Sequence, residues 1–328
     1  MQALELNVKL IQLTAMLQDG AYHDGTLLGK QLGVTRSAIW KMIKKLQGYG
    51  VPIESVKGKG YILRQALELL NKQLIINEVS KPSLIIEVFE SLASTNDYLR
   101  AFFTTRTPRI CLAETQTKGR GRLQRQWHSP FAENIYFSCL YTFQKDISEL
   151  AGLSMAVCMA IIKTLQPYCD APLKAKWPND VLCEGKKLAG TLIEVQAETN
   201  GLSHTIIGIG INVNMLSTAI HDISQSWVSL RELHGAYINR NELCISLINH
   251  LFQELNRFEQ QGLLSFFEEW RAVDSLLQQV IELQFINQKI VSGQVMGIDA
   301  QGHLLLQLPD GTIQGFSAGD VTIRKNLK

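Results

Sequence analysis

Basic residues alternate with glycine near the middle of this 328-residue chain. Residues 118–122 read Lys-Gly-Arg-Gly-Arg, and Arg125 and Trp127 follow closely. Glycine lets the backbone approach a ligand, and guanidinium groups offer forked donors that match phosphate or carboxylate oxygens. The segment therefore predicts a loop that binds an anion. It lacks the GxxxxGK[ST] pattern of a Walker motif, and taken alone it equally fits a flexible basic surface loop.

A second cluster of polar residues lies some 50 positions further along the chain. Lys176-Trp177-Pro178-Asn179-Asp180 is followed by Lys186-Lys187-Leu188-Ala189-Gly190, which opens an apolar strand. Pro178 stiffens the approach to the two polar residues after it, and the strand beyond Gly190 can hold a ligand near backbone amides. The two adjacent lysines also fit the solvated tip of a hairpin.

Two more segments combine small and polar residues at predicted strands. Gly208-Ile209-Gly210-Ile211-Asn212 places glycines and an amide in a buried strand, which indicates either close strand packing or a nucleotide lying against the backbone. Ser94-Thr95-Asn96 stands where a strand meets a helix. Ser94 is there either a ligand-binding hydroxyl or an ordinary helix N-cap.

The first 64 residues carry nine Lys and Arg against four Asp and Glu, a local charge of +5, whereas the remainder carries 23 against 26. Apolar spacing and turn residues predict three helices and a two-stranded hairpin with Lys57-Gly58-Lys59-Gly60 at its tip. The predicted elements are helices over 8–17, 26–32 and 36–46 and strands over 53–56 and 61–63. This order is typical of a winged helix-turn-helix.

The third predicted helix has an apolar stripe of Ile39, Ile43 and Leu46 and a cationic opposite face. A solvated charged face is the alternative, but cations on a helix after a helix-turn, together with a basic hairpin tip, favour DNA binding. Trp40 either contacts the DNA surface or covers the domain's own core. The predicted DNA-binding residues are Thr35, Arg36, Ser37, Trp40, Lys41, Lys57 and Lys59.

Beyond residue 65, a helical pattern over Ala66–Leu70 and 71–74 should link this module to a larger one. Strand-like and helical segments alternate over 86–270, which predicts a mixed α/β domain. After Ser275 the strands become short and closely spaced, which predicts a small β-barrel. The predicted domains are 1–65, 66–274 and 275–328.

Composition narrows the class of protein further. With 46% apolar and 19% charged residues, the chain is able to bury large cores and is not a disordered protein. No uninterrupted apolar run approaches the roughly 20 residues of a membrane span, so we expect a cytoplasmic protein that does not enter the membrane. Six scattered cysteines without a CxxC pair, and seven His without HExxH, argue against disulfides and protein-bound metal.

Taken together and in this order, the motifs resemble those of the bifunctional biotin-protein ligases that also repress the biotin operon. The resemblance covers essentially the full length. Its most specific residues are Ser94-Thr95-Asn96, Glu114-Thr115-Gln116, Gly119-Arg120-Gly121-Arg122, residues 176–180, and Lys187-Leu188-Ala189-Gly190. One departure concerns Gln124, which stands where the family loop usually has glycine and so bears on the loop's flexibility.

This resemblance implies an α+β multidomain fold: a winged helix-turn-helix, a central class II synthetase-like mixed α/β ligase domain and a C-terminal SH3-like β-barrel. It implies that biotin and ATP, with Mg²⁺, form biotinyl-5′-adenylate, and that the biotinyl group then passes to a lysine of biotin carboxyl carrier protein. It further implies that the adenylate acts as corepressor by favouring a homodimer that binds a palindromic operator.

The site residues are implied by the same resemblance. Lys187, Arg120, Arg122 and Asp180 are expected to serve the chemistry, Lys187 by touching both the biotin carboxylate and the α-phosphate. Asn179, Asn212 and Trp227 are expected near the nucleotide, with residues 215–226 ordering over it. The residues expected to contact biotin are Ser94, Thr95, Asn96, Gln116, Arg120, Gly121, Arg122, Trp127, Lys187 and Gly190.

Two rival functions remain open. The first rival is a transcription factor that only binds biotin or its adenylate. Such a sensor would not need Lys187 and Arg122 at the reacting centre, so their presence argues against it. A ligase for lipoate or octanoate would need neither a DNA-binding domain nor a polar triplet suited to a ureido group.

Overall fold

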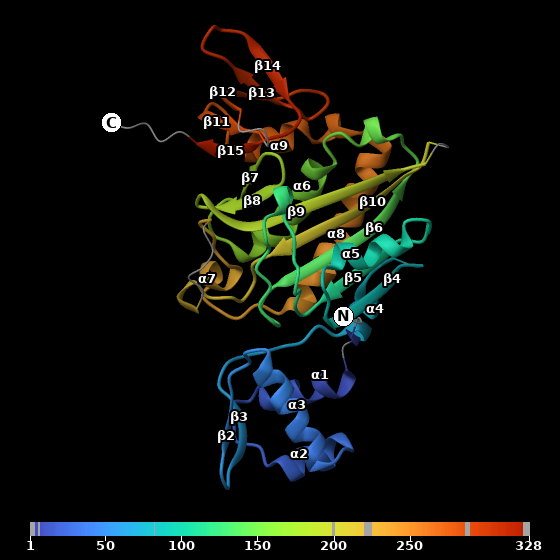
Figure 1. Ribbon diagram of the computed structural model, residues 1–328, viewed down its shortest axis with the longest axis vertical. Helices are drawn as coiled ribbons and strands as arrows, with labels where there is room; N and C mark the ends of the chain where they lie inside the picture. Colours follow the sequence, from blue (N-terminus) through green and yellow to red (C-terminus); the bar gives the residue numbers. More distant parts are fainter. Residues whose placement is uncertain are drawn as a thin grey trace.

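The structure, a computed structural model, describes residues 4–5, 7–81, 83–198, 201–219, 225–285 and 289–323. It is elongated, with a small helical part at one end, an eight-stranded sheet in the middle and a five-stranded sheet at the other end (Figure 1). This arrangement confirms the predicted α+β multidomain organisation at that level. The domain limits at residues 65 and 274 stay predictions.

The N-terminal part has the predicted order of elements. Helices α1 (Val8–Leu17), α2 (Gly25–Leu32) and α3 (Arg36–Gly48) precede strands β2 (Ile53–Val56) and β3 (Gly60–Leu63). Thr35 caps α3, because its Oγ1 accepts a hydrogen bond from the Ala38 amide at 3.2 Å. The turn before β3 requires Gly60, since a Cβ there would collide with the carbonyl of His23.

The segment between this part and the central sheet differs from the prediction. Ala66–Leu70 has no regular structure, and helix α4 (Lys72–Glu78) begins only after the cap at Asn71. Leu67 and Leu69 pack into the N-terminal core, whereas Leu70 packs into the central core. Adjacent residues therefore face different cores, which an extended chain allows and a helix with a single apolar stripe does not.

The central sheet is mainly antiparallel and has the order β1-β4-β5-β6-β10-β9-β8-β7. Strands β4 and β5 form its parallel pair. The long neighbours β6, β10 and β9 form its middle, and the β8–β9 hairpin brings the second predicted polar cluster to one end of it. The strands are β1 (Leu4–Glu5), β4 (Ile85–Ser91), β5 (Arg109–Ala113), β6 (Ile135–Phe143), β7 (Lys174–Lys176), β8 (Asp180–Cys183), β9 (Lys186–Ala197) and β10 (Ser203–Ile211).

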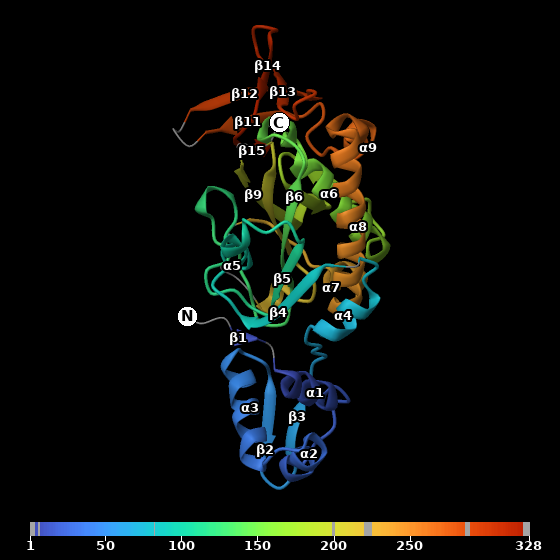
Figure 2. The ribbon, with the colours of Figure 1, turned by 90° about the vertical axis from the view of Figure 1, so that its right-hand side faces the viewer.

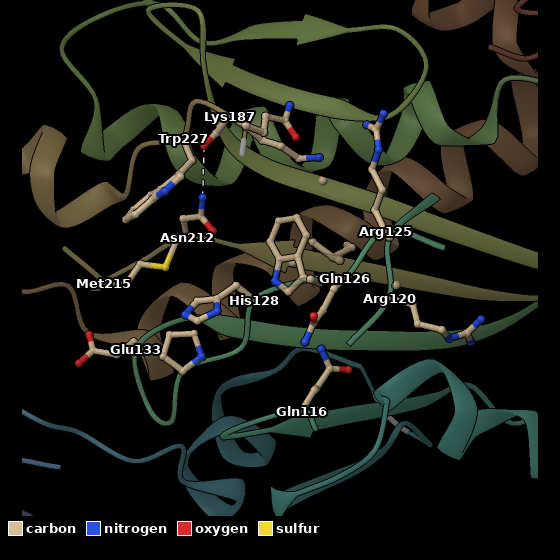
Figure 3. A pocket seen from close by; sticks show the side chains of 18 of the residues that line it. Gln116, Arg120, Arg125, Gln126, His128, Glu133, Lys187, Asn212, Met215 and Trp227 are labelled. Atoms are coloured by element: carbon tan, nitrogen blue, oxygen red, sulfur yellow. Dashed lines mark hydrogen bonds between the residues drawn. The ribbon is translucent and has the colours of Figure 1, made fainter. Parts of the chain in front are cut away.

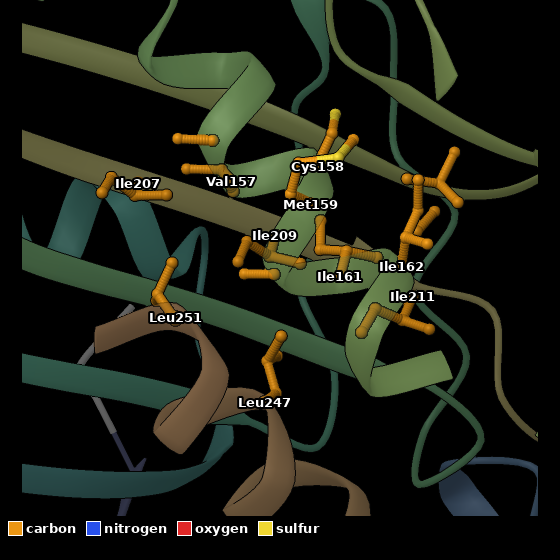
Figure 4. Close-up of a cluster of buried hydrophobic side chains, with 14 of the residues drawn as sticks. Val157, Cys158, Met159, Ile161, Ile162, Ile207, Ile209, Ile211, Leu247 and Leu251 are labelled. Atoms are coloured by element: carbon orange, nitrogen blue, oxygen red, sulfur yellow. The ribbon is translucent and has the colours of Figure 1, made fainter. Parts of the chain in front are cut away.

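Helices cover both faces of this sheet (Figure 2). The long helices α6 (Leu153–Leu165) and α8 (Arg240–Gln261) lie on one face, and α5 (Thr95–Leu99) lies on the other. Helix α5 is short and continues only as a 3-10 turn, η1 (Arg100–Phe102). The short helices α7 (Leu230–His234) and α9 (Phe267–Val273) complete the fold. Figure 4 shows the core that results, with labelled side chains of α6, α8 and β10 in contact.

One described stretch, Ile147–Tyr168, is long and apolar enough to cross a membrane by length and composition alone. It contains α6, and 61% of its most apolar window is buried inside the protein. Burial against α8 and the sheet accounts for this apolar composition, because a helix buried on most sides has little need for polar residues.

The C-terminal part is a five-stranded antiparallel sheet in the order β14-β13-β12-β11-β15. Within the described residues β14 and β15 do not pair, so the sheet is not closed into a barrel. Its core joins the central core without a break, and the Trp177 indole donates a hydrogen bond to the Gly302 carbonyl at 3.0 Å. The strands are β11 (Val280–Gln284), β12 (Ile290–Ile298), β13 (Leu304–Gln307), β14 (Ile313–Phe316) and β15 (Asp320–Ile323).

Candidate active site

A cavity of about 1450 Å³ opens at the end of the central sheet where the β8–β9 hairpin lies, and residues of all three parts of the chain line it (Figure 3). Every residue predicted to bind or transform a small molecule lines this one cavity. They come from the β4–α5 junction, from the segment over 116–127, from the β8–β9 hairpin, from the end of β10 and from the segment before α7. The fold therefore gathers segments that are far apart in the sequence.

The ammonium group of Lys187 lies within this cavity. Its Nζ is 2.8 Å from Asp180 Oδ1, and the two side chains are only 18% and 14% exposed. The Trp127 ring lies beneath the ammonium, with its centroid 5.5 Å from Nζ. Gly190 provides the room, because a Cβ there would lie 3.0 Å from Lys187 Cε and 3.2 Å from Asp180 Oδ1. The alternative of a solvated hairpin tip thus applies to Lys186, which is exposed, and not to Lys187.

Two further cations line the same part of the cavity. Arg122 Nη1 donates a hydrogen bond to Asn179 Oδ1 at 3.4 Å, and the Asn179 amide is itself held by the Thr191 carbonyl at 2.6 Å. Burial lowers the pKa of Arg122 and of Lys176 from their ordinary values, because a cation loses hydration there. Four cations, Lys187, Arg122, Lys176 and Arg125, lie near two carboxylates, Asp180 and Asp320, and this surplus of positive charge favours an anionic ligand.

The β4–α5 junction forms a polar end of the cavity. Gln116 Oε1 accepts hydrogen bonds from the amide and the hydroxyl of Thr95, at 2.9 and 3.2 Å. Ser138 lies behind them, with its hydroxyl oxygen 2.7 Å from Thr95 Oγ1 and 2.6 Å from Asn96 Oδ1. Ser94 caps α5 by accepting from the Asp97 amide at 3.4 Å, so the N-cap alternative describes its hydrogen bond, although it also lines the cavity.

Gly208 and Gly210 serve close packing. A Cβ at Gly208 would overlap the Asn96 amide, and one at Gly210 would overlap the Trp127 ring. Of the two interpretations that the sequence left open, the packing one describes this structure. Trp127 is thereby held with its indole Nε1 buried and without a hydrogen-bond partner among the described residues. A buried donor of this kind suits an acceptor atom on a ligand.

Arg120 does not point at the other cations. Its Nη2 donates to Asp97 Oδ1 at 2.5 Å and to Glu194 Oε1 at 3.1 Å, and Figure 3 shows its side chain directed away from Lys187. Carboxylates on α5 and β9 hold the guanidinium at the margin of the cavity. The expected contact of Arg120 with biotin therefore requires this pairing to break and stays a prediction.

Two of the three residues expected near the nucleotide, Asn212 and Trp227, lie together on the other side, whereas Asn179 lies beside Arg122. Figure 3 places Trp227, Asn212 and Met215 opposite Arg125. The Asn212 amide donates to the carbonyls of Lys187 and Val228, at 3.2 and 3.3 Å, and so ties the start of β9 to the segment that carries Trp227. Part of the loop expected over the adenine, residues 220–224, lies outside the described residues.

Several residues that line the cavity were not predicted. His128 directly follows Trp127 of the basic loop, and Glu133 lies five residues further along the chain. Their position close to this motif was the sequence signal that could have indicated them. Burial raises the pKa of Glu133 above its ordinary value. Asp320 comes from the C-terminal sheet almost 200 residues away from the loop that it contacts, and nothing in the sequence pattern pointed to it.

The residues predicted to bind DNA are exposed on α3 and on the β2–β3 hairpin. Trp40 is 51% exposed, so it does not cover the core of its own domain. The C-terminal end of α3 is different, because Lys45 Nζ lies 2.7 Å from the Glu90 carboxylate and the Tyr49 hydroxyl donates to it at 2.7 Å. Cationic residues near the start of α3 thus face outward, whereas its end is docked on the central sheet.

Family models match all three parts of the chain. The Biotin/lipoate A/B protein ligase family matches residues 88–212, an HTH domain matches 9–62 and the Biotin protein ligase C terminal domain matches 278–324.

Relatives match the chain over nearly its full length. The bifunctional ligase/repressor BirA of Escherichia coli is 34% identical over 98% of this chain and 99% of its own, and that of Bacillus subtilis is 27% identical over 90% and 93%. The structure of the biotin protein ligase from Aquifex aeolicus in complex with biotin and ATP is 26% identical, with a TM-score of 0.62, and covers 75% of this chain and 100% of its own. The chain therefore belongs to the bifunctional ligase/repressors of the biotin protein ligase family.

Proposed function

We propose that the cavity joins biotin to ATP and then passes the biotinyl group to a lysine of biotin carboxyl carrier protein. The observation that carries this proposal is the convergence of Lys187, Arg122 and Lys176 in one partly enclosed cavity that has a hydrogen-bonding end at Thr95 and Gln116. Such a site holds an anion at its centre and a polar head group at one end. The winged helix-turn-helix on the same chain makes the protein a repressor as well as an enzyme.

The chemistry requires a carboxylate to attack an anionic α-phosphate, and the two repel each other. Lys187 lowers this barrier when its ammonium group lies between them, because a preorganised cation stabilises charge that develops in the transition state. Its partial burial strengthens the effect, since less water screens the charge. Arg122 adds a second cation that stays protonated despite burial.

Mg²⁺ fits this site as part of the MgATP substrate. The described residues contain no group of three or more His, Cys, Asp or Glu that would hold a metal ion. The phosphates of ATP would therefore supply most ligands, as is usual for this ion. When bound, it neutralises the polyphosphate.

The two ends of the cavity suit the two substrates. Thr95 and Gln116 are placed to hydrogen-bond the ureido group of biotin, and Trp127 walls the apolar bicycle. Asn212 and Trp227 lie on the opposite side, where adenine would bind. Lys187, between these ends, would contact the new bond between the carboxyl oxygen and the phosphorus.

Asp180 is placed to act in the second step. It pairs with Lys187 in this structure, and it becomes free to receive a proton from the carrier lysine once Lys187 turns to the adenylate. We predict that Asp180→Asn slows transfer from preformed adenylate by about 10²- to 10⁴-fold, the range for loss of a general base. Single-turnover transfer to a carrier domain measures this, and transfer at the wild-type rate would show that Asp180 has no such role.

An assay of protein-bound label tests the function and separates it from its rivals. Purified protein is incubated with labelled biotin, MgATP and a carrier domain, and parallel reactions contain lipoate or octanoate. Label on the carrier lysine from biotin alone supports the ligase. Bound biotin without transfer indicates a sensor, and transfer of lipoate or octanoate indicates the other kind of ligase.

Repression would begin with DNA contacts from α3 and the β2–β3 hairpin. Lys57 and Lys59 stand exposed at the hairpin tip, where a wing meets phosphates. We expect Lys57→Ala and Lys59→Ala to reduce the slope of log K against log salt by about 0.9 for each phosphate that is no longer neutralised. Titration of duplex DNA at several salt concentrations measures the slope, with Lys72→Ala, in α4, as control. Unchanged slopes would place the DNA elsewhere.

A homodimer would bring two winged helices to a palindromic operator. One support is the free edge of β9: within the described residues, 193–197 pair with β10 on one side, whereas β8 pairs only as far as Gly190 and Asn179 binds the backbone of Thr191. A free strand edge offers backbone groups to a second copy. Sedimentation with biotin and MgATP should show a larger dimer fraction than without them, and an unchanged monomer fraction would exclude this coupling.

The remaining structural and cellular expectations are also proposals. We infer that β11–β15 are an SH3-like barrel with an open seam and that the central sheet is of the class II synthetase type; the antiparallel order of both sheets supports this. We place the protein in the cytoplasm, without membrane attachment, because its DNA and its carrier substrate are there. Its six cysteines are all free and buried, which suits a reducing compartment.

A further inference from the structure

The basic loop contacts the C-terminal sheet across the mouth of the cavity. Arg125 forms a forked pair with Asp320, in which Nη2 donates to Oδ2 and Nη1 donates to Oδ1 at 3.5 Å. Asp320 begins β15, and residues 319–322 line the cavity together with Arg122. The loop is therefore held from a different domain than the one that carries the rest of the site.

The loop has an unusual turn next to this contact. Leu123 and Gln124 both have positive φ, 54° and 59°, although neither is glycine. The left-handed conformation is unfavourable for a residue with a side chain. The turn is closed by a hydrogen bond from the Gly121 amide to the Arg125 carbonyl at 2.7 Å. A strained turn of this kind persists only when its surroundings hold it.

We propose that Asp320 is a positioning residue: through Arg125 it holds the loop over residues 118–127 across the cavity, so that the C-terminal domain sets how long the reaction intermediate is retained. This inference rests on the proposed function, because the intermediate is the adenylate. According to this proposal, the C-terminal sheet affects how long the adenylate stays bound more than how fast it forms.

Three observations support a role beyond that of an ordinary surface ion pair. The pair is forked, and forked arginine–carboxylate pairs are stronger and more directional than single contacts. Asp320 is anchored, since β15 pairs with β11 and the sheet core is continuous with the central core. The strained turn at residues 123–124 lies between Arg122 and Arg125. When the Arg125 side chain is fixed by Asp320, the turn therefore also fixes the position of Arg122.

The test is the rate at which adenylate leaves the full-length protein. Labelled adenylate is formed in place, unlabelled biotin and ATP are added in excess, and the loss of bound label is followed. Asp320→Asn should release adenylate about three- to tenfold faster, because the pair is partly exposed, with side chains 58% and 34% exposed, and such pairs are weak to moderate. Asp310→Asn, the same change in an exposed turn of the same sheet, should release it at the wild-type rate.

A charge exchange distinguishes positioning from a general loss of structure. The double variant Arg125→Asp with Asp320→Arg restores the pair in reverse and should bring the release rate back towards wild type, whereas Arg125→Asp alone should release as fast as Asp320→Asn or faster. Equal release by wild type and Asp320→Asn, or no recovery in the double variant, would overturn the proposal. If wild-type protein forms no adenylate at all, the proposed function fails instead, so the two failures are distinguishable.

Discussion

Replacing Lys187 by glutamine should reduce adenylate formation by at least about 10²- to 10³-fold, the loss expected when one preorganised group that stabilises developing charge is removed. Glutamine keeps much of the length and the hydrogen-bonding capacity of lysine but has no charge. The repulsion between carboxylate and α-phosphate then remains uncompensated at the centre of the cavity. Biotin-dependent exchange of labelled pyrophosphate into ATP measures this step directly.

The neighbouring lysine provides a matched control. Lys186 precedes Lys187 on the same strand but is exposed, so Lys186→Gln should retain the wild-type exchange rate. Since Lys187→Gln also leaves Asp180 without its ion-pair partner, thermal unfolding of Lys187→Gln and of the double variant with Asp180→Asn should be compared. Exchange at more than a tenth of the wild-type rate in folded Lys187→Gln would remove Lys187 from the reacting centre.

The second large effect concerns the junction between the DNA-binding domain and the active site. Phe131 belongs to the loop that follows Trp127, yet it packs in the N-terminal core, where it is 5% exposed. Its ring stacks on Tyr49 with a centroid distance of 4.3 Å, and Tyr49 ends helix α3. Phe131→Ala should therefore destabilise this junction by about 3 to 5 kcal/mol, as for other buried aromatic truncations.

Calorimetry and hydrogen exchange measure this prediction. A separate unfolding transition of the N-terminal domain should appear at lower temperature, and the amides of α3 should lose protection from hydrogen exchange. The reason is that loss of the ring leaves a cavity between this domain and the loop on which it packs. Tyr22→Ala, at an exposed position in the same domain, serves as the control. A single transition at the wild-type temperature would show that the N-terminal domain is stable without this contact.

The same junction connects the polar end of the cavity to the N-terminal domain. Gln116, at the polar end of the cavity, contacts Ser129, and Phe131 lies two residues further along the same loop. Glu90, whose side chain is 1% exposed, binds both Lys45 and Tyr49 from the central sheet. A buried carboxylate is costly without partners, so the domain and the sheet stabilise each other at this point.

Some of this organisation is predictable from sequence for clear physical reasons. The apolar stripe of α3 is a local pattern with a period of 3.6 residues, and the helix appears where it was predicted. The cluster from 176 to 190 is also local, because a hairpin brings Asp180 and Lys187 together across β8 and β9. Gly190, three residues after Lys187, leaves room for the side chains of Lys187 and Asp180.

Other features depend on contacts between distant segments, which local patterns do not encode. Ala66–Leu70 looked helical because its leucines are closely spaced, but two cores compete for them. Arg120 belongs to the basic loop, yet its guanidinium binds Asp97 and Glu194, which lie on α5 and β9 outside that motif, and its contact with a ligand stays a prediction. Neither Phe131 nor Asp320 belongs to a recognisable motif, and each acts by completing a contact with another domain.

A crystal structure of the protein grown with biotin and MgATP tests the central claim most directly. We expect biotinyl-5′-adenylate in the cavity between Thr95 and Trp227, with Lys187 turned from Asp180 towards the linkage of carboxyl group and phosphate. A cavity that stays empty under saturating substrates, or a ligand bound elsewhere while Lys187 still pairs only with Asp180, would contradict it.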